Sequence, residues 1–216
     1  AVSFVAIRCT VGDYYSDYKF EEYWDKSGEA GIPHTPYMVI APADSTNVRK
    51  ISARAQMDYF FSKFGDREPD FQIILDSELS RGQTREYITA TIAECVEMSE
   101  LRFDEYPLMY TRKTWFDFWT NPHPSFGKCG LFAARYAEGL TGPWSDGVYR
   151  FRDWKDWVFW QKSDKGKLPG ISNAVDIDVF NGGTDDLSSY LGQKTISQRL
   201  AILEREAALR GWNLEP

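Results

Sequence analysis

Buried-strand patterns alternate with amphipathic helix patterns through most of this chain, and that alternation limits the folds open to it. Apolar and β-branched runs that end in polar or glycine-containing turns predict strands. The first five are Val2–Ile7, Pro36–Ile40, Phe71–Asp76, Tyr106–Tyr110 and Leu131–Tyr136. Residues 138–154 are loop-like, and two more strands, Trp157–Gln161 and Val175–Phe180, follow without a helix between them. We therefore expect an α/β fold built on a parallel β/α barrel that becomes irregular in its last third.

Helical patterns lie between the early strands. The first helix carries Phe20 and Trp24 on one face, and the second has an apolar stripe within Ile51–Phe64. The third is expected to begin at a capping box formed by Ser80 and Gln83. Helices between consecutive strands are what a parallel sheet requires, because each parallel connection must cross back over the sheet.

The end of the chain has a different pattern. A charged segment, residues 194–210, carries apolar side chains at four-three-four spacing: Ile196, Leu200, Leu203 and Ala207. This spacing predicts an amphipathic C-terminal helix. We accordingly divide the chain into a barrel, residues 1–192, and a helical tail, residues 193–216. The tail could pack on the barrel, mediate self-association or begin a linker.

Composition excludes several kinds of site. The chain of 216 residues has a net charge of −7 and no basic stripe, which argues against a nucleic-acid partner. No apolar run approaches the roughly 20 residues of a membrane span. Three scattered cysteines and two histidines indicate neither a disulfide framework, nor a metal site, nor a Ser-His-Asp triad, and no cofactor is expected. Carboxylates remain as the candidates for acid/base chemistry.

One predicted strand ends in two acids. In Phe71–Glu78 the two-residue period of a strand would direct Asp76 and Glu78 to the same side, with Ser77 facing away. Two carboxylates at the carboxyl end of a barrel strand are the arrangement that cleavage of a glycosidic bond needs. The alternative is a strand that runs into a solvated acidic turn. Aromatic residues make up 16% of the chain, which suits a sugar-binding cleft, although core packing explains most of them.

Several short sequence blocks occur in a recognisable order. They are Phe4–Gly12, Gly31–Pro33 with Tyr37, Gln56 with Phe60, Ile74–Glu78, Pro107–Thr111, Phe132–Tyr136, Trp157–Gln161, Leu168–Ile171 and Val175–Gly182. In order and spacing, the chain resembles glycoside hydrolase family 25, the N-acetylmuramidase lysozymes of bacteria, phages and some fungi. The resemblance covers about Val2 to Gly182. It implies an irregular TIM-like barrel with fewer helices than strands.

The resemblance also implies an activity and a set of site residues. The family hydrolyses the β-1,4 bond between N-acetylmuramic acid and N-acetylglucosamine in peptidoglycan. By position, Glu78 matches the general acid, Asp76 the neighbouring carboxylate and Asp176 the acid on the last strand. The residues expected to bind the glycan are Tyr37, Tyr110, Trp160 and Arg135. Such an enzyme would be secreted or phage-encoded and would act outside the cell or on the cell wall.

In the expected mechanism, Glu78 is protonated near neutral pH because the other acids and apolar walls crowd it. Asp76 stays ionised, and it either activates a water or orients the 2-acetamido group of the substrate.

Two departures from the family pattern leave other functions open. The family begins with a strand that carries D-x-S, and this sequence starts at what corresponds to the second strand. The missing strand removes one carboxylate and predicts two exposed sheet edges. The third strand reads Tyr37-Met38-Val39 where the family usually has Y-H-F. An inactive glycan-binding protein and a structural or assembly protein on the same barrel therefore stand as alternatives to an active muramidase.

Overall fold

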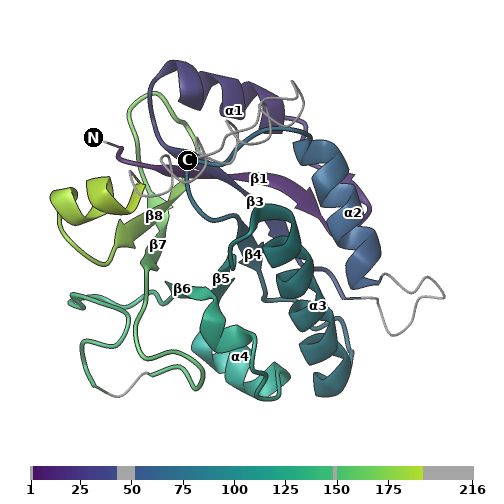
Figure 1. Cartoon of the computed structure of the whole chain (residues 1–216). Helices are drawn as coiled ribbons and strands as arrows, with labels where there is room; N and C mark the ends of the chain where they lie inside the picture. The colour runs from purple at the N-terminus through teal and green to yellow at the C-terminus, as the bar shows by residue number, and fades with distance from the viewer. Residues whose placement is uncertain (1, 43–51, 148–149, 192–216) are drawn as a thin grey trace, which may run out of the picture.

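One curled sheet of eight strands forms the centre of the molecule (Figure 1). The computed structural model describes residues 2–42, 52–147 and 150–191. The strands are β1 (Val5–Val11), β2 (Tyr15–Ser16), β3 (His34–Val39), β4 (Ile74–Asp76), β5 (Leu108–Thr111), β6 (Gly130–Ala134), β7 (Phe159–Gly166) and β8 (Val175–Phe180). Their order in the sheet is β2-β1-β3-β4-β5-β6-β7-β8. Strands β1 and β3 to β7 are parallel, whereas β2 and β8 pair antiparallel with their neighbours.

This topology confirms the predicted α/β class and the irregular TIM-like barrel with fewer helices than strands. The change from parallel to antiparallel pairing at β7 and β8 is the irregularity expected in the last third. It arises because residues 167–174 form a short connection without a helix, and such a connection can only reverse the chain. Strand β7 begins at Phe159 rather than Trp157, because the Trp157 amide is bonded to the Asp156 carboxylate.

The sheet does not close on itself within the described residues. Strand β1 pairs with β3 along one side, and on its other side it pairs with β2 only at Thr10 and Val11. The outer edge of β8 carries no strand in the part of the chain that the structure describes. Within the described residues the sheet therefore has two edges, along most of the outer side of β1 and along the outer side of β8, as the sequence predicts.

Four helices cover the convex side of the sheet (Figure 1): α1 (Phe20–Glu29), α2 (Ala53–Phe64), α3 (Arg85–Phe103) and α4 (Lys113–Trp119). A 3-10 turn, η1 (Phe126–Lys128), precedes β6, and residues 184–191 after β8 are helical. The predicted capping box at Ser80 is wrong. Helix α3 begins after Thr84, whose side chain accepts the Tyr87 amide, and Ser80 instead closes a turn with the Gln83 amide.

Two apolar clusters lie on the two faces of the sheet. The larger joins the helices to the outward-facing strand residues, which include Met38, Leu75, Met109 and Leu131. The smaller fills the concave side and contains Phe71, Ile74, Leu108, Phe132 and Phe159. Ring contacts of Phe4 with Phe159 (4.8 Å) and of Tyr190 with Phe180 (5.3 Å) extend it at the amino ends of the parallel strands. The concave side is therefore packed at that end, and the opposite end remains for polar side chains.

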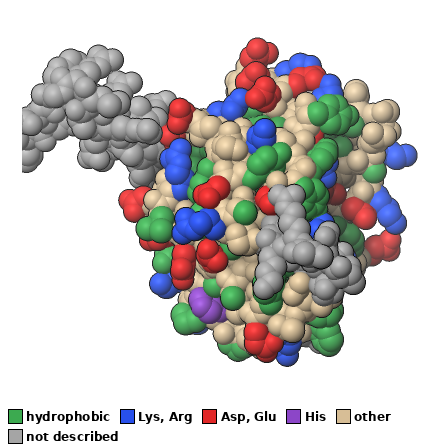
Figure 2. Space-filling view, turned by 90° about the vertical axis from the view of Figure 1, so that its right-hand side faces the viewer, with side chains coloured by type: hydrophobic (Ala, Val, Ile, Leu, Met, Phe, Trp, Pro, Cys, Tyr) green, Lys and Arg blue, Asp and Glu red, His purple; other side chains and the backbone are tan. Residues whose placement is uncertain are grey.

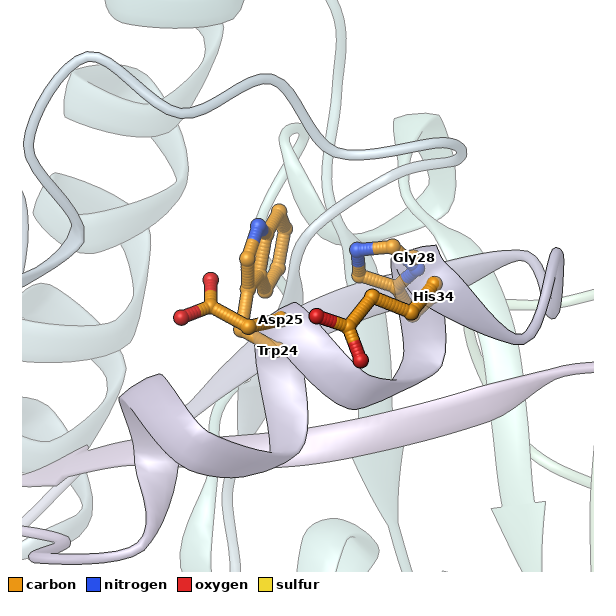
Figure 3. Close-up of a pocket in the computed structure, with 5 residues that line it drawn as sticks. Trp24, Asp25, Gly28 and His34 are labelled. Atoms are coloured by element: carbon orange, nitrogen blue, oxygen red, sulfur yellow. The ribbon is translucent and has the colours of Figure 1, made fainter.

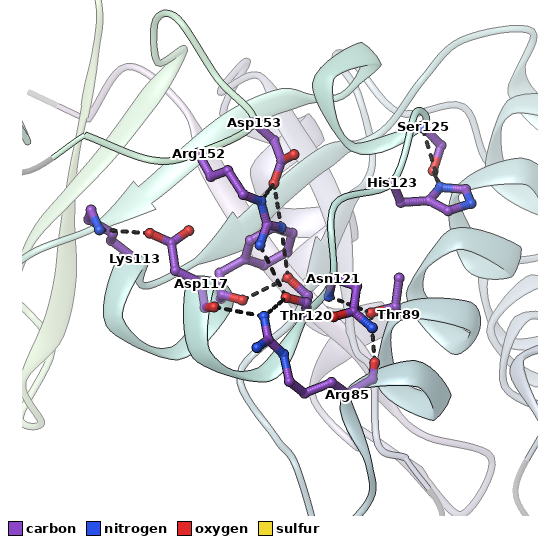
Figure 4. Close-up of polar contacts among 11 residues, drawn as sticks. Arg85, Thr89, Lys113, Asp117, Thr120, Asn121, His123, Ser125, Arg152 and Asp153 are labelled. Atoms are coloured by element: carbon purple, nitrogen blue, oxygen red, sulfur yellow. Dashed lines mark hydrogen bonds and ion pairs between the residues drawn. The ribbon is translucent and has the colours of Figure 1, made fainter.

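A buried polar junction fixes α4 between α3 and the loop before β7 (Figure 4). Arg152 donates to the backbone oxygen and to the hydroxyl of Thr120, both at 3.1 Å, and pairs with Asp153 at 2.7 Å. Arg85 donates to the same Thr120 oxygen at 2.6 Å. Thr120 is fully buried, so these bonds satisfy polar atoms that water does not reach.

Replacing Arg152 by Ala is therefore expected to destabilise the fold by about 1–3 kcal/mol, because Thr120 loses buried partners. Urea unfolding followed by circular dichroism measures the change. Arg152→Lys is the control that keeps the charge but cannot reproduce two parallel donors. Equal stability of all three proteins would show that the junction contributes little.

The face covered by α2 and α3 displays acidic and basic side chains that are interspersed (Figure 2). Within the described residues, no helix is long and apolar enough to cross a membrane. The predicted tail helix and the boundary at residue 193 lie outside the described residues.

Candidate functional site

The candidate site lies at the carboxyl ends of the central parallel strands. Asp76 is the last residue of β4, in register with Val39 of β3 and Tyr110 of β5. Its backbone oxygen accepts the Ile40 amide at 2.8 Å, and the next amide, of Ser77, donates to the Tyr110 oxygen at 2.9 Å. The Thr111 hydroxyl donates to the Ser77 oxygen at 2.6 Å. The backbone that carries both acids is thus held on two sides by neighbouring strands.

Asp76 is a buried carboxyl. Its residue is 8% exposed, and its Oδ1 has no hydrogen-bond partner among the described residues. Burial raises the pKa of Asp76 well above the ordinary value, and the charge of Glu78 adds to this effect. The resemblance predicts that Asp76 stays ionised, whereas its surroundings in the free protein favour the protonated form. The reason is desolvation, which the strand pattern did not reveal.

Glu78 lies in a different environment. It follows the end of β4, and its side chain is 27% exposed. Nη2 of Arg112 donates to its Oε2 at 2.8 Å. The two acids of the D-x-E sequence therefore differ: one is buried and the other is paired with a cation.

Asp176, near the start of β8, is the third predicted acid. Asp176 is exposed. Its negative charge nevertheless helps to raise the pKa values of Asp76, Tyr37 and Tyr136. The charge of Glu78 in turn helps to raise the pKa of Asp176. Burial, followed by the charges of Asp164 and Glu78, raises the pKa of Asp176. The structure thus brings Asp76, Glu78 and Asp176 into one electrostatic cluster on the concave side.

Two of the predicted aromatic residues border this cluster. Burial raises the pKa of Tyr37 to about 12, and the charge of Asp76 is among the smaller causes. Burial also raises the pKa of Tyr110, and the acids of the cluster add to it. The Tyr110 hydroxyl donates to Oε1 of Gln161 at 2.7 Å, and Tyr136 donates to the same oxygen. These hydroxyls are therefore oriented before any ligand binds.

The other two predicted glycan-binding residues point elsewhere. Alternation along β7 puts Phe159 and Gln161 on the concave side and Trp160 on the opposite face. Trp160 is 3% exposed, and its indole nitrogen donates to the Arg135 backbone oxygen at 2.9 Å. The Arg135 side chain is bonded to the Pro143 oxygen and to Asp146. The structure does not bring Trp160 and Arg135 to the acidic cluster.

Several residues of the cluster were missed by sequence reasoning. Gln161 and Tyr136 were present in the recognised blocks, and the strand period of β7 could have placed Gln161 beside Tyr110. Asp178, which follows Asp176 by two residues on β8, was not among the predicted site residues. In the structure, burial raises its pKa to about 7, and the charge of Asp176 adds to this. No sequence pattern indicated Arg112, because helix α3 and strand β5 lie between it and its partner Glu78 in the chain.

Two concave surfaces lie away from the cluster. One, of about 400 Å³, is formed by α1 and the start of β3 and is lined by Trp24, Asp25, Gly28, Glu29 and His34 (Figure 3). The other, of about 490 Å³, surrounds the amino ends of β6 and β7. Both lie at the end of the sheet opposite to Asp76. In the described part of the chain, no three His, Cys, Asp or Glu side chains are arranged to hold a metal ion.

The sequence of the chain is similar to a known protein family and to several of its relatives. The sequence pattern described as Glycosyl hydrolases family 25 matches residues 1–171. The protein YegX of Escherichia coli strain K12 is 26% identical over 190 residues, which cover 88% of this chain and 63% of YegX. Lysozyme M1 of Streptomyces globisporus is 28% identical over 195 residues, covering 84% of this chain and 60% of that protein. The chain thus spans less than two thirds of the length of these relatives.

Solved structures have a similar fold. A family GH25 lysozyme from Aspergillus fumigatus superposes with a TM-score of 0.71 at 26% identity, covering 88% of this chain and 87% of that one. The bacterial lysozyme from Streptomyces coelicolor also gives a TM-score of 0.71, at 23% identity, covering 89% and 87%. At 23% identity, the similarity to the Streptomyces coelicolor lysozyme shows a shared fold and nothing further.

Proposed function

Because the chain belongs to glycosyl hydrolases family 25, we propose that it cleaves the β-1,4 bond between N-acetylmuramic acid and N-acetylglucosamine in peptidoglycan. In this proposal Glu78 is the general acid, and Asp76 and Asp176 assist it. Tyr37 and Tyr110 contact the sugar rings. The cell wall is the expected place of action, and the glycan strand is the expected partner.

One observation carries this proposal: three carboxyl groups from β4, the turn after it and β8 interact electrostatically at the carboxyl ends of the strands. A glycosidase needs one carboxyl that donates a proton and one that is ionised, and these roles require different environments. Asp76 is buried and Glu78 is paired with Arg112, so the two carboxyls lie in different environments. The tyrosine hydroxyls beside them can bond the polar edges of a sugar.

Asp76 has two routes open to it once it is ionised. It could activate a water on the far side of the sugar ring, or it could orient the 2-acetamido group as an internal nucleophile. The first route inverts the anomeric configuration, and the second retains it. The anomer of the first-formed product, read by proton NMR, separates them.

Digestion of purified peptidoglycan tests the proposed function. We expect new reducing ends that carry N-acetylmuramic acid, identified by mass spectrometry of the borohydride-reduced products. Ends that carry N-acetylglucosamine would assign the cleavage to the other linkage. Saturable binding without new reducing ends would favour the alternative of an inactive glycan-binding protein.

A further inference from the structure

Gln161 connects two tyrosine hydroxyls with a carboxyl on the concave side of the sheet. Its residue is 6% exposed. Its Oε1 accepts the Tyr110 hydroxyl at 2.7 Å and also accepts the hydroxyl of Tyr136. On the other side, Gln161 of β7 is in register with Asp178 of β8, and the two side chains are hydrogen-bonded. A single buried amide thus joins groups from β5, the segment after β6, β7 and β8.

The chemistry of the side chains fixes the direction of these bonds. Burial raises the pKa of the Asp178 carboxyl, and the contact with Gln161 acts in the opposite direction, which is the effect of a donor on a carboxylate. Nε2 is the only donor that a glutamine side chain has, so Nε2 faces Asp178 and Oε1 faces the tyrosines. Turning the amide over would set Oε1 against the carboxyl, with two acceptors face to face. Because Oε1 carries no proton, the tyrosines must supply the protons of the bonds to it.

Both tyrosine protons are used within this group of oxygens. A phenol has a single O–H proton. The Tyr110 and Tyr136 hydroxyls also interact with each other. The protons therefore either both go to Oε1 of Gln161, or one passes from Tyr110 to Tyr136 and the other from Tyr136 to Oε1. Neither arrangement leaves an O–H for a ligand, so any further contact of the two hydroxyls is made through a lone pair.

These lone pairs lie among the acids of the candidate site. The charges of Glu78 and Asp76 act on Tyr110, and that of Asp176 acts on Tyr136. Tyr110 is partly exposed and Tyr136 is 46% exposed, so neither side chain is closed off from a ligand. The negative charge of the cluster attracts the positive hydrogen of a donor and repels an oxygen that presents only lone pairs. Acceptors that lie beside acids therefore select a ligand group that donates a hydrogen bond.

We propose that Gln161 makes Tyr110 and Tyr136 act only as acceptors, and that the site thereby selects glycans by an amide N–H, that of the 2-acetamido group of an N-acetylhexosamine. This inference rests on the proposed function. Gln161 is a positioning residue, because it acts on the ligand through the two tyrosines. A sugar hydroxyl both donates and accepts, so it fits a tyrosine of either orientation. An amide N–H only donates, so it is the group that requires a fixed acceptor.

Two disaccharides test this inference by NMR titration. The first is N-acetylglucosaminyl-β-1,4-N-acetylmuramic acid, which lacks the bond that the proposed activity cleaves. The second has oxygen in place of the nitrogen in both 2-acetamido groups, so it keeps each carbonyl and loses each N–H. We expect the unaltered protein to bind the amide about fivefold more tightly than the ester, since one neutral hydrogen bond contributes about this much. Equal binding of the two ligands, or binding of neither, would overturn the inference.

Gln161→Met keeps the length of the side chain and removes both its acceptor and its donor. The tyrosine hydroxyls are then free to donate to a carbonyl of the ligand, so the preference for the amide is expected to fall to within about twofold. Tyr110→Phe and Tyr136→Phe each remove one acceptor, and they test the inference even if Gln161→Met does not fold. At least one of them should lose the preference. A full preference in Gln161→Met, or in both phenylalanine variants, would overturn the inference.

A second glutamine supplies the matched control at the opposite end of the sheet. Gln72 precedes β4, its Oε1 accepts the Tyr190 hydroxyl, and its Nε2 donates to Glu105. The order of carboxyl, glutamine and tyrosine is thus the same as at Gln161. Gln72→Met is expected to leave the preference for amide over ester unchanged. If it reproduced the loss, a general change in the protein would explain both results, and Gln161 would have no particular role.

Hydrolysis of peptidoglycan separates this inference from the proposed function. If the unaltered protein prefers the amide but releases no reducing ends, the proposed function is wrong and the role of Gln161 in binding still holds. If the unaltered protein releases reducing ends but binds amide and ester equally, the proposed function holds and this inference is wrong.

Discussion

Glu78→Gln is expected to lower the rate of peptidoglycan hydrolysis by about 10³-fold or more, while the protein stays folded. The amide keeps the size of the side chain and can still accept a hydrogen bond from Arg112, but it cannot donate a proton to the leaving oxygen. Removing the charge of a partly exposed ion pair changes stability by only about 0–1 kcal/mol. The loss would therefore lie in the chemistry and not in the fold.

The measurement is release of reducing ends from purified peptidoglycan, with thermal unfolding recorded for the same samples. Glu97→Gln, on the exposed side of α3, is the matched control and is expected to keep full activity. Full activity of Glu78→Gln would remove Glu78 from the role of general acid. Activity lost together with the fold would mean that the ion pair with Arg112 supports the structure.

Sequence reasoning located the acids but not their environments. The strand period applies to Asp76, since β4 extends as far as that residue, and Asp76 lies on the same face of the sheet as Ile74. Glu78 lies beyond the strand, where the period no longer applies. Its position depends on backbone bonds of Ser77 to β5 and on Arg112, which are contacts between segments far apart in the sequence. A periodic pattern carries no information about such contacts.

The aromatic residues show a different limit. Trp157–Gln161 was recognised as a strand, and its alternation alone puts Phe159 and Gln161 on one face and Trp160 on the other, as the structure has them. Trp160 was assigned to the site from the family resemblance instead. Tyr37 and Tyr110 lie in the middle of regular parallel strands and were placed with the acids. Alternation along the strands was therefore the better guide to the face that each side chain occupies.

Asp178→Asn is expected to stabilise the protein at about pH 8 by about 2 to 4 kcal/mol. Burial, and then the charge of Asp176, raises the pKa of Asp178 to about 7 in the folded protein, whereas an unfolded chain has a value of about 3.9. The folded state thus binds this proton more tightly than the unfolded state does. The contribution of Asp178 to stability is full below about pH 4 and is lost as the pH rises to about 7.

An asparagine at this position cannot ionise, so it avoids the cost of a buried charge above about pH 7. Its amide also keeps an oxygen that can accept the bond from Gln161. Urea unfolding at about pH 4, 6 and 8 should therefore show curves for the two proteins that coincide at low pH and separate as the pH rises. Asp58→Asn, on the exposed side of α2, should follow the unaltered protein throughout.

A variant that is less stable than the unaltered protein at about pH 8 would contradict this account, because it would mean that the Asp178 carboxylate makes favourable contacts when charged. If the stabilised variant also loses hydrolysis, the two results together have a physical meaning. Oδ1 of Asp178 has no hydrogen-bond partner among the described residues, and the carboxyl interacts with Gln161 and with the charge of Asp176. The Asp178 carboxyl would then lower stability while supporting activity through its charge on the acids and tyrosines of the site. Such a conflict between stability and activity is common in enzymes.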